Sequence, residues 1–395
     1  RPGVPEQHRV SEAIDTADLV FYVSGHGYGH ATRSAALIAA LRRMSPGSLR
    51  IHVRSEAPHW IFQPDWVSQP HRVSQPDGVS QERDGQLTCS AVGIDPGIIQ
   101  SNALDVDLEA TIDAHQQFAS RWDAHLGEEA DLLRRLAPRV VVSDIPPPAI
   151  AAASAAGIPA VRVTNFTCDR TLAGYADREP RLRPIIRRYA EAYREADCVF
   201  QLPMHGDLGA FRGIVDVPLL TRRSRLPRAS VWKQLGIRGD QGLPVVLISF
   251  GGFGSGPLAS FDGANLTGMV FLAFEEKPKG FRGDWRRLPN PSPVLHQELV
   301  AACDAVIGKP GYSTAAEVLA HRTRFLYLSR GDYTEGPVLE AGLRRDGCAR
   351  PIPRDDFFAG RWREHLDALL AQPLPAQAPA ANGAEVIAAQ LLEKM

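Results

Sequence analysis

The chain has 395 residues, which is too long for one ordinary α/β core and fits two domains of about 150 to 220 residues each. Hydrophobic residues make up 44% and charged residues 23%, a globular composition that argues against long disordered regions. Lys plus Arg (44) and Asp plus Glu (45) leave a formal charge of -1, so no overall field attracts nucleic acid or an anionic bilayer, and an anionic ligand must be held by local geometry.

The first predicted elements open a doubly wound parallel sheet. Apolar Leu19 to Val23 predicts a strand, Ser24 to His30 forms a glycine-rich turn, Thr32 to Met44 predicts a helix, and Leu49 to Val53 predicts the next strand. The backbone amides of such a turn and of the helix N-terminus point into the crevice at the strand ends. The turn is therefore a candidate binding loop.

The turn itself reads GHGYGHATRS. Gly27 and Gly29 would permit close approach of a ligand, and His26 and His30 would be unusual in a purely structural loop. A tight turn without a ligand stays an alternative. A dinucleotide-binding turn is a weaker one, because the second strand ends without the acidic residue that would hold an adenosine ribose. Arg33, on the first helix, is interpreted as a solvated or structural residue.

A repeated tripeptide, a helical stretch and a DxD sequence follow in the same domain. The tripeptide Val-Ser-Gln recurs three times between Gln63 and Gln81, with prolines between the copies, which predicts a flexible surface loop. Asp107 to Leu136 shows helical periodicity. The sequence Asp105-Val106-Asp107 matches a metal-binding DxD, but Asp107 serves better as the N-cap of that helix, so no metal site is expected.

Asp144 follows the predicted strand Val140 to Ser143, and a helix at Ala149 to Ala156 and a strand at Ala160 to Thr164 continue the β-α-β pattern. A proline run separates Asp144 from this helix and is expected to break the backbone. Residues at the carboxyl end of a central strand face the crevice, so Asp144 is a candidate site residue. A turn-forming aspartate before prolines is an equally good interpretation.

The second half repeats the pattern after a stretch rich in Pro, Arg and Gly at Arg212 to Gly242, which is the best linker candidate. Strand Val245 to Phe250 leads into a glycine turn with Gly251 and Gly252. The predicted division is an N-terminal extension at 1–18, a Rossmann-like domain at 19–220, a linker at 221–243, a second Rossmann-like domain at 244–370, and a tether with a last helix at 371–395 that could pack on either domain.

The most informative segment of the second half is IGKPGYSTAAEVLA. Gly311 shapes a loop, and Ser313 and Thr314 lie where hydroxyls and free amides at a helix N-terminus would receive a diphosphate, with Lys309 beside them. Glu317 falls one turn later on the face of Ser313, where a carboxylate could accept two ribose hydroxyls. A capping box made by the same hydroxyls and glutamate is the structural alternative.

Several segments together resemble the N-terminal, glycosyltransferase-like half of plant-type L-arabinokinases and their stand-alone bacterial relatives. The resemblance runs from about Leu19 to Leu370 and is carried by GHGYGHATR, DPGIIQSNALDVD, SDIPPPAIAAASAAGIPAVRVTNFTCD, IGKPGYSTAAEVLA and RRDGCARPIPRDDFFAGRWREHL. A looser similarity extends to GT-B enzymes such as the transferase that adds N-acetylglucosamine to lipid I, whose GGTGGH loop resembles residues 25–30. The resemblance implies two facing Rossmann-like domains, with a UDP-sugar held by the C-terminal one and an unknown acceptor on the N-terminal side.

This resemblance implies a UDP-sugar-dependent glycosyltransferase that is inverting, metal-independent and without a further cofactor. His30 matches the final histidine of the lipid-I-type loop and is the candidate general base, with Asp144 to orient it and His26 as competitor. The stretch GDYTEGP offers Asp332 and Glu335 as donor contacts but lacks the glutamines of lipid-I-type enzymes, so the sugar stays open. A catalytically silent nucleotide-sugar sensor and a UDP-sugar epimerase are the alternatives.

The five cysteines are scattered, with neither CxxC spacing nor a histidine-rich neighbourhood, so we expect reduced thiols rather than disulfides or zinc ligands. No stretch approaches about 18 apolar residues, so no membrane segment is expected. The opening residues Arg1 to Asp18 are polar and contain no signal-peptide core. A cytoplasmic location is the resulting expectation.

Overall fold

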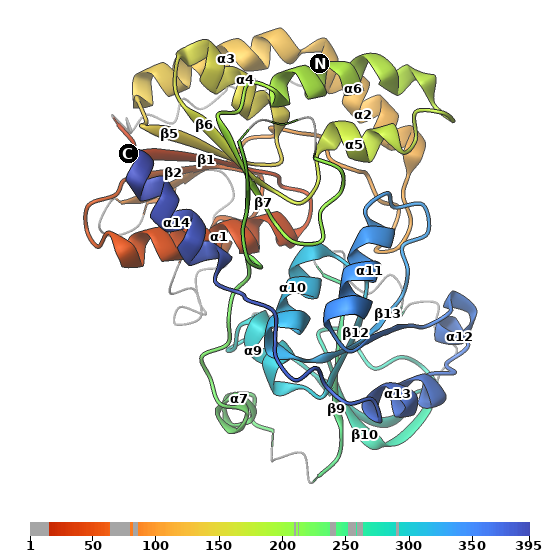
Figure 1. Ribbon diagram of the computed structural model, residues 1–395. Helices are drawn as coiled ribbons and strands as arrows, with labels where there is room; N and C mark the ends of the chain where they lie inside the picture. Colours follow the sequence, from red (N-terminus) through yellow and green to blue (C-terminus); the bar gives the residue numbers. More distant parts are fainter. Residues whose placement is uncertain are drawn as a thin grey trace, which may run out of the picture.

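The computed structural model describes residues 16–63, 80–81, 86–208, 211, 213–237, 242–251, 258, 264–289 and 292–395. Within these residues the chain forms two α/β units, each with one β-sheet covered by helices (Figure 1). The Val-Ser-Gln repeats fall largely outside the described residues, as do Gly252 and most of the predicted N-terminal extension.

The first unit holds eight strands and its helices among the described residues. The strands are β1 (Leu19–Val23), β2 (Ile51–Arg54), β3 (Ser80–Gln81), β4 (Leu87–Ser90), β5 (Val140–Asp144), β6 (Ala160–Thr164), β7 (Cys198–Gln201) and β8 (Ile214–Asp216), in the spatial order β3-β4-β2-β1-β5-β6-β7-β8. The helices are α1 (Tyr28–Met44), α2 (Leu108–Ser120), α3 (Trp122–Leu136), α4 (Pro147–Ala156), α5 (Cys168–Ala173) and α6 (Arg183–Tyr193), with short 3-10 turns η1 (His59–Ile61) and η3 (Pro180–Leu182).

The second unit has six described strands, all pairing in parallel. They are β9 (Val245–Ser249), β10 (Asn265–Ala273), β11 (Arg282–Arg287), β12 (Ala305–Gly308), β13 (Arg324–Tyr327) and β14 (Ala349–Pro351), ordered β11-β10-β9-β12-β13-β14. The helices of this part of the chain are α7 (Arg228–Gln234), α9 (His296–Ala302), α10 (Tyr312–His321), α11 (Gly336–Asp346), α12 (Arg354–Phe358) and α13 (Arg363–Leu370), and a last helix, α14 (Gly383–Lys394), follows them.

Each sheet reverses its winding direction between two central strands, β1 and β5 in the first sheet and β9 and β12 in the second. Open α/β sheets bind ligands outside the carboxyl ends of the strands at such a point. Val23 and Asp144 are register partners at the first point, and Ser249 and Gly308 are partners at the second. The strand order therefore places the two predicted glycine turns at the two ligand-binding positions of the fold.

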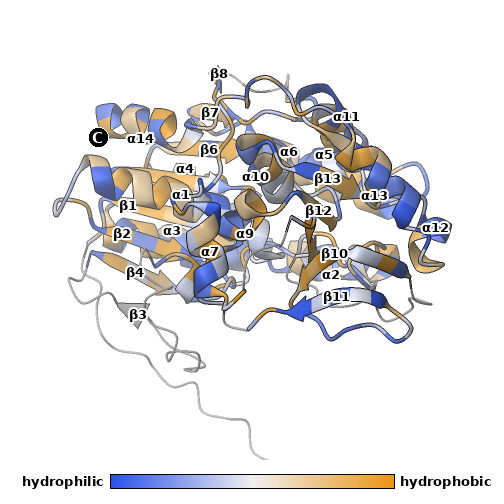
Figure 2. Cartoon of the chain, turned by 90° about the horizontal axis from the view of Figure 1, so that it is seen from below, coloured by the Kyte–Doolittle hydropathy of each residue, from blue (hydrophilic) through white to orange (hydrophobic). Residues whose placement is uncertain are grey.

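The central strands are apolar, whereas the edge strand β11 is hydrophilic (Figure 2). It carries charged residues at alternate positions, and none of its residues is buried. Charged side chains on an edge strand discourage pairing with another chain. The buried strands β1, β5 and β6 show no exposed position, as expected for a parallel sheet covered on both faces.

Several elements differ from the sequence-based expectation. The periodic stretch 107–136 is two helices, because the chain turns at Arg121, where α2 ends and α3 begins. The proline run does not break the chain: Pro147 and Pro148 form the first turn of α4, where a missing N–H has no intrahelical partner to lose. The start of the linker candidate Arg212 to Gly242 contains β8, which pairs with β7 and extends the first sheet.

Helix α14 returns from the second unit and packs against α1 of the first (Figure 1). Its apolar residues Ile387 and Leu391 are fully buried, and Arg43 of α1 pairs with Glu385 at 2.8 Å. The sequence left open which domain this helix covers, and the structure places it on the N-terminal one. The C-terminal segment therefore ties the two units together on the side of α1.

All five cysteines are free, as the sequence predicted, and the structure shows that they are buried. In the part of the chain that the structure describes, no helix is both long and apolar enough to span a membrane.

Candidate functional site

The N-termini of α1 and α10 meet where the two units face each other. Ser313 Oγ donates a hydrogen bond to the Gly29 carbonyl at 2.8 Å, and a Cβ at Gly29 would lie 3.3 Å from that hydroxyl oxygen. The guanidinium carbon of Arg33 lies 5.1 Å from the centroid of the Tyr312 ring. The glycine turn of the first unit and the helix start of the second are thus in direct contact, and together they form the candidate site.

Asp144 is the centre of a buried polar network behind the glycine turn. Arg33 donates from Nε to Oδ2 at 2.8 Å and from Nη2 to Oδ1, and Ser34 Oγ donates to Oδ2 at 2.8 Å. Arg33 also donates from Nη1 to the Asn165 side-chain oxygen at 2.8 Å. Burial alone would raise the pKa of Asp144, but Arg33 and His30 hold it well below its usual range. The carboxylate is therefore ionised throughout the physiological range.

His30 is the member of this network that reaches the solvent. Its side chain is 26% exposed, and Nδ1 lies 3.0 Å from Asp144 Oδ1. Arg33 Nη2 also lies 3.0 Å from the same Nδ1. In the tautomer in which Nδ1 carries the proton and donates to the carboxylate, Nε2 is left as an acceptor. Nε2 makes no hydrogen bond within the part of the chain that the structure describes. This geometry fits a base oriented by a carboxylate.

His26 has a different environment. Its Nε2 lies 2.8 Å from the backbone oxygen of Asp95, so this nitrogen is engaged with a loop of the first unit. The ring packs against Gly97, where a Cβ would come within 2.2 Å of it and where φ is +58°. His26 is thus held by the loop beside the site, whereas His30 presents a ring nitrogen to it.

On the opposite side of the site, Glu317 is buried and bound to a histidine that the sequence gave no reason to select. Glu317 Oε2 lies 2.7 Å from His296 Nδ1, and His296 Nε2 lies 2.8 Å from Ser249 Oγ. Burial would lower the pKa of His296, but the contact with Glu317 raises it overall. The capping-box alternative is wrong: the N-cap of α10 is Gly311, and the Ser313 and Glu317 side chains bind partners outside the helix end. Thr314 lies half-buried in its first turn.

Lys309 stands in the loop that precedes α10. Burial, with a further contribution from Arg330, lowers the pKa of Lys309 to about 7. Its Nζ lies 3.4 Å from the side-chain oxygen of Gln100 in the first unit. Gly251 adopts a φ of +77° opposite this lysine, and a Cβ there would lie 3.9 Å from Lys309 Cε.

The two acidic residues of the GDYTEGP stretch have different surroundings. Asp332 is exposed and pairs with Arg178 of the first unit at 2.9 Å, at the rim of the interface. Glu335 lies within electrostatic reach of His30 and Arg33, and its Oε1 accepts a hydrogen bond from the Thr171 hydroxyl at 3.3 Å. Burial raises the pKa of Glu335. The structure therefore brings Glu335, and not Asp332, to the His30 network.

The DxD aspartates serve the interface and a helix end. Asp107 accepts a hydrogen bond from the backbone N–H of Ala110 at 3.0 Å and caps α2, as the sequence predicted. Asp105 forms a bidentate pair with Arg354 of the second unit at 2.6 and 2.9 Å. Both side chains are thus engaged with protein groups.

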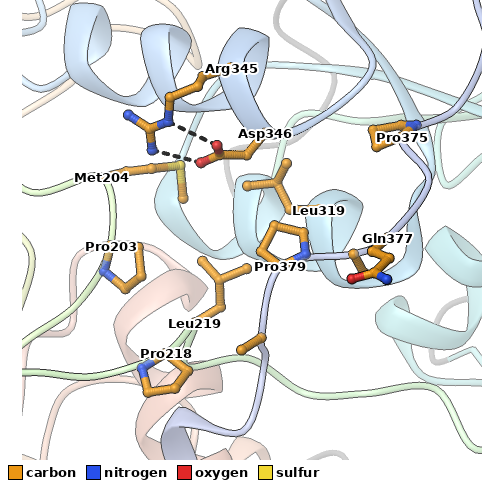
Figure 3. Close-up of a pocket in the computed structure, with 12 residues that line it drawn as sticks. Pro203, Met204, Pro218, Leu219, Leu319, Arg345, Asp346, Pro375, Gln377 and Pro379 are labelled. Atoms are coloured by element: carbon orange, nitrogen blue, oxygen red, sulfur yellow. Dashed lines mark hydrogen bonds and ion pairs between the residues drawn. The ribbon is translucent and has the colours of Figure 1, made fainter.

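A cavity of about 570 Å³ lies elsewhere, beside the segment that leads to α14 (Figure 3). It is bordered by the end of α11, by Met204 and Leu219 of the first unit, and by Pro375 and Pro379 of the returning segment. None of the candidate residues described above lines it, so it is separate from the site.

No protein-family model matches the chain. The L-arabinokinase of Arabidopsis thaliana is 31% identical over 405 residues, a match that covers 99% of this chain and 36% of the kinase. The chain therefore spans about a third of that relative's length. This confirms the resemblance to L-arabinokinases predicted from the sequence.

Among solved structures, the calicheamicin glycosyltransferase CalG4 superimposes with a TM-score of 0.54 at 15% identity, over 96% of this chain and 94% of that one. The fold is the GT-B fold. A Listeria monocytogenes structure assigned as a UDP-N-acetylglucosamine 2-epimerase matches with a TM-score of 0.52 at 12% identity, over 95% of each chain. The predicted α/β class with two facing Rossmann-like domains is confirmed, and the candidate site lies between the two domains of a GT-B protein.

Proposed function

We propose that the protein transfers a sugar from a UDP-sugar to an acceptor hydroxyl, with inversion and without a metal ion. The observation that carries this proposal is the His30–Asp144 pair, because it leaves Nε2 of His30 without a hydrogen bond among the described residues, and the neighbouring Gly29 contacts Ser313 at the N-terminus of α10. A general base on one side and an anion-binding helix end on the other are the two parts that displacement of a nucleoside diphosphate requires.

On the donor side, the free amides at the start of α10 and the hydroxyls of Ser313 and Thr314 would receive the diphosphate. Lys309 would add positive charge as the diphosphate leaves, the task that a bound cation performs in other transferases. Glu317 would accept the two ribose hydroxyls, with His296 fixing the orientation of its carboxylate. Ser313 now donates to Gly29, and we expect the diphosphate to compete for this hydroxyl.

On the acceptor side, His30 Nε2 would take the proton of the acceptor hydroxyl. The acceptor oxygen forms its bond to the anomeric carbon while the bond from that carbon to the diphosphate oxygen breaks on the opposite face, which inverts the configuration. The ionised Asp144 stabilises the imidazolium that forms. We expect Glu335, which the charges of His30 and Arg33 influence, to face the transferred sugar or the acceptor.

A UDP-sugar epimerase is kept as the second candidate because an epimerase structure shares the fold. The purified protein should be incubated with a panel of UDP- and GDP-sugars, and both UDP release and isomer formation should be followed by chromatography and mass spectrometry. Slow UDP release from one donor supports the transferase. Formation of an isomeric nucleotide sugar would replace it with the epimerase, and tight binding without either reaction would indicate a sensor module.

Glu317→Ala is expected to weaken UDP binding at least about tenfold. Two charge-assisted hydrogen bonds to the ribose are worth about 1.5 to 3 kcal/mol each and are not fully additive, so tenfold is the lower bound. Titration calorimetry measures the change, with Glu276→Ala, an exposed glutamate of the same domain, as control. Unchanged UDP affinity in a folded Glu317→Ala protein would remove the ribose assignment.

UDP affinity is also expected to fall as the pH rises through about 7. Below this pH Lys309 is charged in the free protein, whereas above it the lysine must take up a proton before it can pair with a diphosphate. The loss should be several-fold, and at most about tenfold per pH unit. Lys309→Arg should flatten the profile, since arginine stays charged. Identical pH profiles for the two proteins would show that Lys309 does not contact the diphosphate.

A further inference from the structure

The linker between the two domains is bound along one short stretch, residues 224–226. The backbone N–H of Arg225 donates to Glu298 Oε1 at 3.0 Å, and that of Leu226 donates to Glu298 Oε2 at 3.1 Å. The Ser224 hydroxyl donates to the same Oε2. Glu298 lies on α9, is 5% exposed and accepts all three hydrogen bonds. We refer to residues 224–226 together with Glu298 and His321 as the linker latch.

His321, the last residue of α10, makes a further contact with the linker. Its Nε2 accepts a hydrogen bond from the backbone N–H of Ser224 at 2.8 Å, and its Nδ1 lies 2.8 Å from the backbone oxygen of Glu317. A backbone N–H can only donate, and a carbonyl oxygen can only accept. Nδ1 therefore carries the proton, Nε2 is the acceptor, and the linker latch requires a neutral His321.

Protonation of His321 would break this contact. The imidazolium carries a second N–H at Nε2, which would face the N–H of Ser224, and two donors cannot pair. Burial lowers the pKa of His321; Glu317 of α10 and Glu298 of α9 oppose this shift, and Arg223 of the linker adds to it. An imidazolium that turns towards Glu298 would compete with the three linker groups that this carboxylate accepts. One proton thus acts against both anchors of the linker latch.

The position of the linker latch sets the length of chain that can adjust between the domains. On its N-terminal side, the backbone N–H of Leu219 donates at 3.0 Å to a carbonyl of the segment that leads to α14, which packs on the first domain. On its C-terminal side, Arg228 forms a bidentate pair with Asp304 of the second domain, at 2.9 Å for each bond. The chain between these anchors is 220–227, and the closed latch shortens it to 220–223. Because hinge segments absorb the backbone changes of domain motion, the closed latch restricts that motion.

We propose that the linker latch is a pH-dependent device: neutral His321 and Glu298 hold residues 224–226 on the second domain, and protonation of His321 releases them. Release lengthens the hinge and lets the two domains move more freely. This inference goes beyond the proposed transfer function and does not depend on it.

The direction of the pH dependence follows from the two states of His321. In the released state the ring is in water, where histidine titrates near about pH 6.5, whereas burial lowers the pKa of the latched ring. The released state therefore binds the proton more strongly. As the pH falls below about 6.5, the ratio of latched to released linker should fall by at most about tenfold per pH unit, until the lowered pKa of the latched ring is reached.

The first measurement is the tautomer of His321 in the wild type at about pH 7.5, above the value at which free histidine titrates. Proton–nitrogen correlation NMR on histidine-labelled protein reports which ring nitrogen carries the proton, and the signals of His321 are those that disappear in His321→Gln. We expect the proton on Nδ1, because both partners of the ring are backbone groups with fixed roles. A proton on Nε2 would contradict the linker latch.

The second measurement is hydrogen exchange of the backbone amides of residues 224–226 in the full chain, at about pH 7.5 and about pH 5.5. Each rate is divided by the intrinsic rate for an unfolded chain at the same pH. Protection should fall several-fold, and at most about tenfold, at the lower pH. The amides of β9, in the core of the second domain, should keep their protection.

Two variants separate the acceptor role of His321 from its charge. In His321→Gln an amide oxygen can accept from Ser224 without titrating, so protection of residues 224–226 should be the same at both pH values. In His321→Phe the acceptor is lost, so protection should be low at both. His365→Gln is the matched control: His365 lies 2.8 Å from Asp356 Oδ2, its partners do not belong to the linker latch, and the variant should keep the pH response of the wild type.

Four results would overturn the inference: an Nε2 proton on His321, equal protection of residues 224–226 at both pH values in the wild type, an unchanged pH response in His321→Gln, or an equal loss of protection in β9. The first two are measured on the wild type, so they decide the question even if His321→Phe does not fold. None of the measurements uses a nucleotide sugar, and their outcome is independent of the proposed function.

Discussion

Replacing His30 by alanine is expected to lower the rate of sugar transfer by about 10² to 10⁴ while leaving UDP affinity within about twofold. Direct displacement at an anomeric carbon needs a base for the acceptor proton, and histidine titrates close enough to neutral pH to act as one. The Nδ1 contact with Asp144 fixes the ring and leaves Nε2 for the acceptor. Single-turnover kinetics with a saturating donor, together with UDP calorimetry, measure the two quantities separately.

His26→Ala is the matched control for this prediction. Its Nε2 is engaged with the backbone oxygen of Asp95, so its removal should disturb the loop but cost less activity than removal of His30. Turnover by His30→Ala within a few-fold of the wild type would disprove the assignment of the base. A larger loss for His26→Ala would transfer the role to the other histidine.

Asp144→Ala is expected to destabilise the protein by about 3 to 5 kcal/mol. The change leaves the fully buried guanidinium of Arg33 without its counter-charge, and breaking one side of a buried ion pair has this cost. Urea unfolding measures this loss as a lower midpoint concentration of urea, provided that the slope of the unfolding free energy against urea is the same in both proteins. Asp332→Ala, which removes one partner of the exposed pair with Arg178, is the control and should have little effect.

The same ion pair predicts a pH dependence. Arg33 keeps the pKa of Asp144 below its unfolded value, so the stabilisation is complete above about pH 4 and is lost as the pH falls through the lowered folded value. Arg33→Met combined with Asp144→Leu should recover part of the stability that Asp144→Ala loses, because it removes both buried charges. If Asp144→Ala unfolds at the same urea concentration as the wild type, the network does not hold the N-terminal domain together.

The parts of the site that lie at strand ends could be predicted from the sequence. The turn after β1 and Asp144 after β5 follow from the general rule that crevice residues stand at the carboxyl ends of central strands, and the structure joins them through His30. The sequence favours a solvated or structural role for Arg33, and the structure shows it buried against Asp144. The small residues around Arg33 in the sequence of α1 do not show whether the arginine is exposed to solvent or buried in an ion pair.

Other features depend on contacts between distant segments and could not be predicted. His296 lies 21 residues before Glu317, in a different helix. Only the packing of α9 beside α10 brings the two side chains together. The placement of α14 on the N-terminal domain likewise depends on which apolar surface is free after both sheets have folded.

The most direct test of the central claim is a transfer assay with the wild type and His30→Ala side by side. Both proteins are incubated with each UDP-sugar of the panel and a panel of hydroxyl-bearing acceptors, and UDP and glycoside are quantified by mass spectrometry. The proposed function predicts UDP and a new glycoside in equal amounts for the wild type, with both at least about 100-fold lower for His30→Ala although UDP still binds. Equal product from the two proteins, or UDP binding by the wild type without product from any donor, would contradict it.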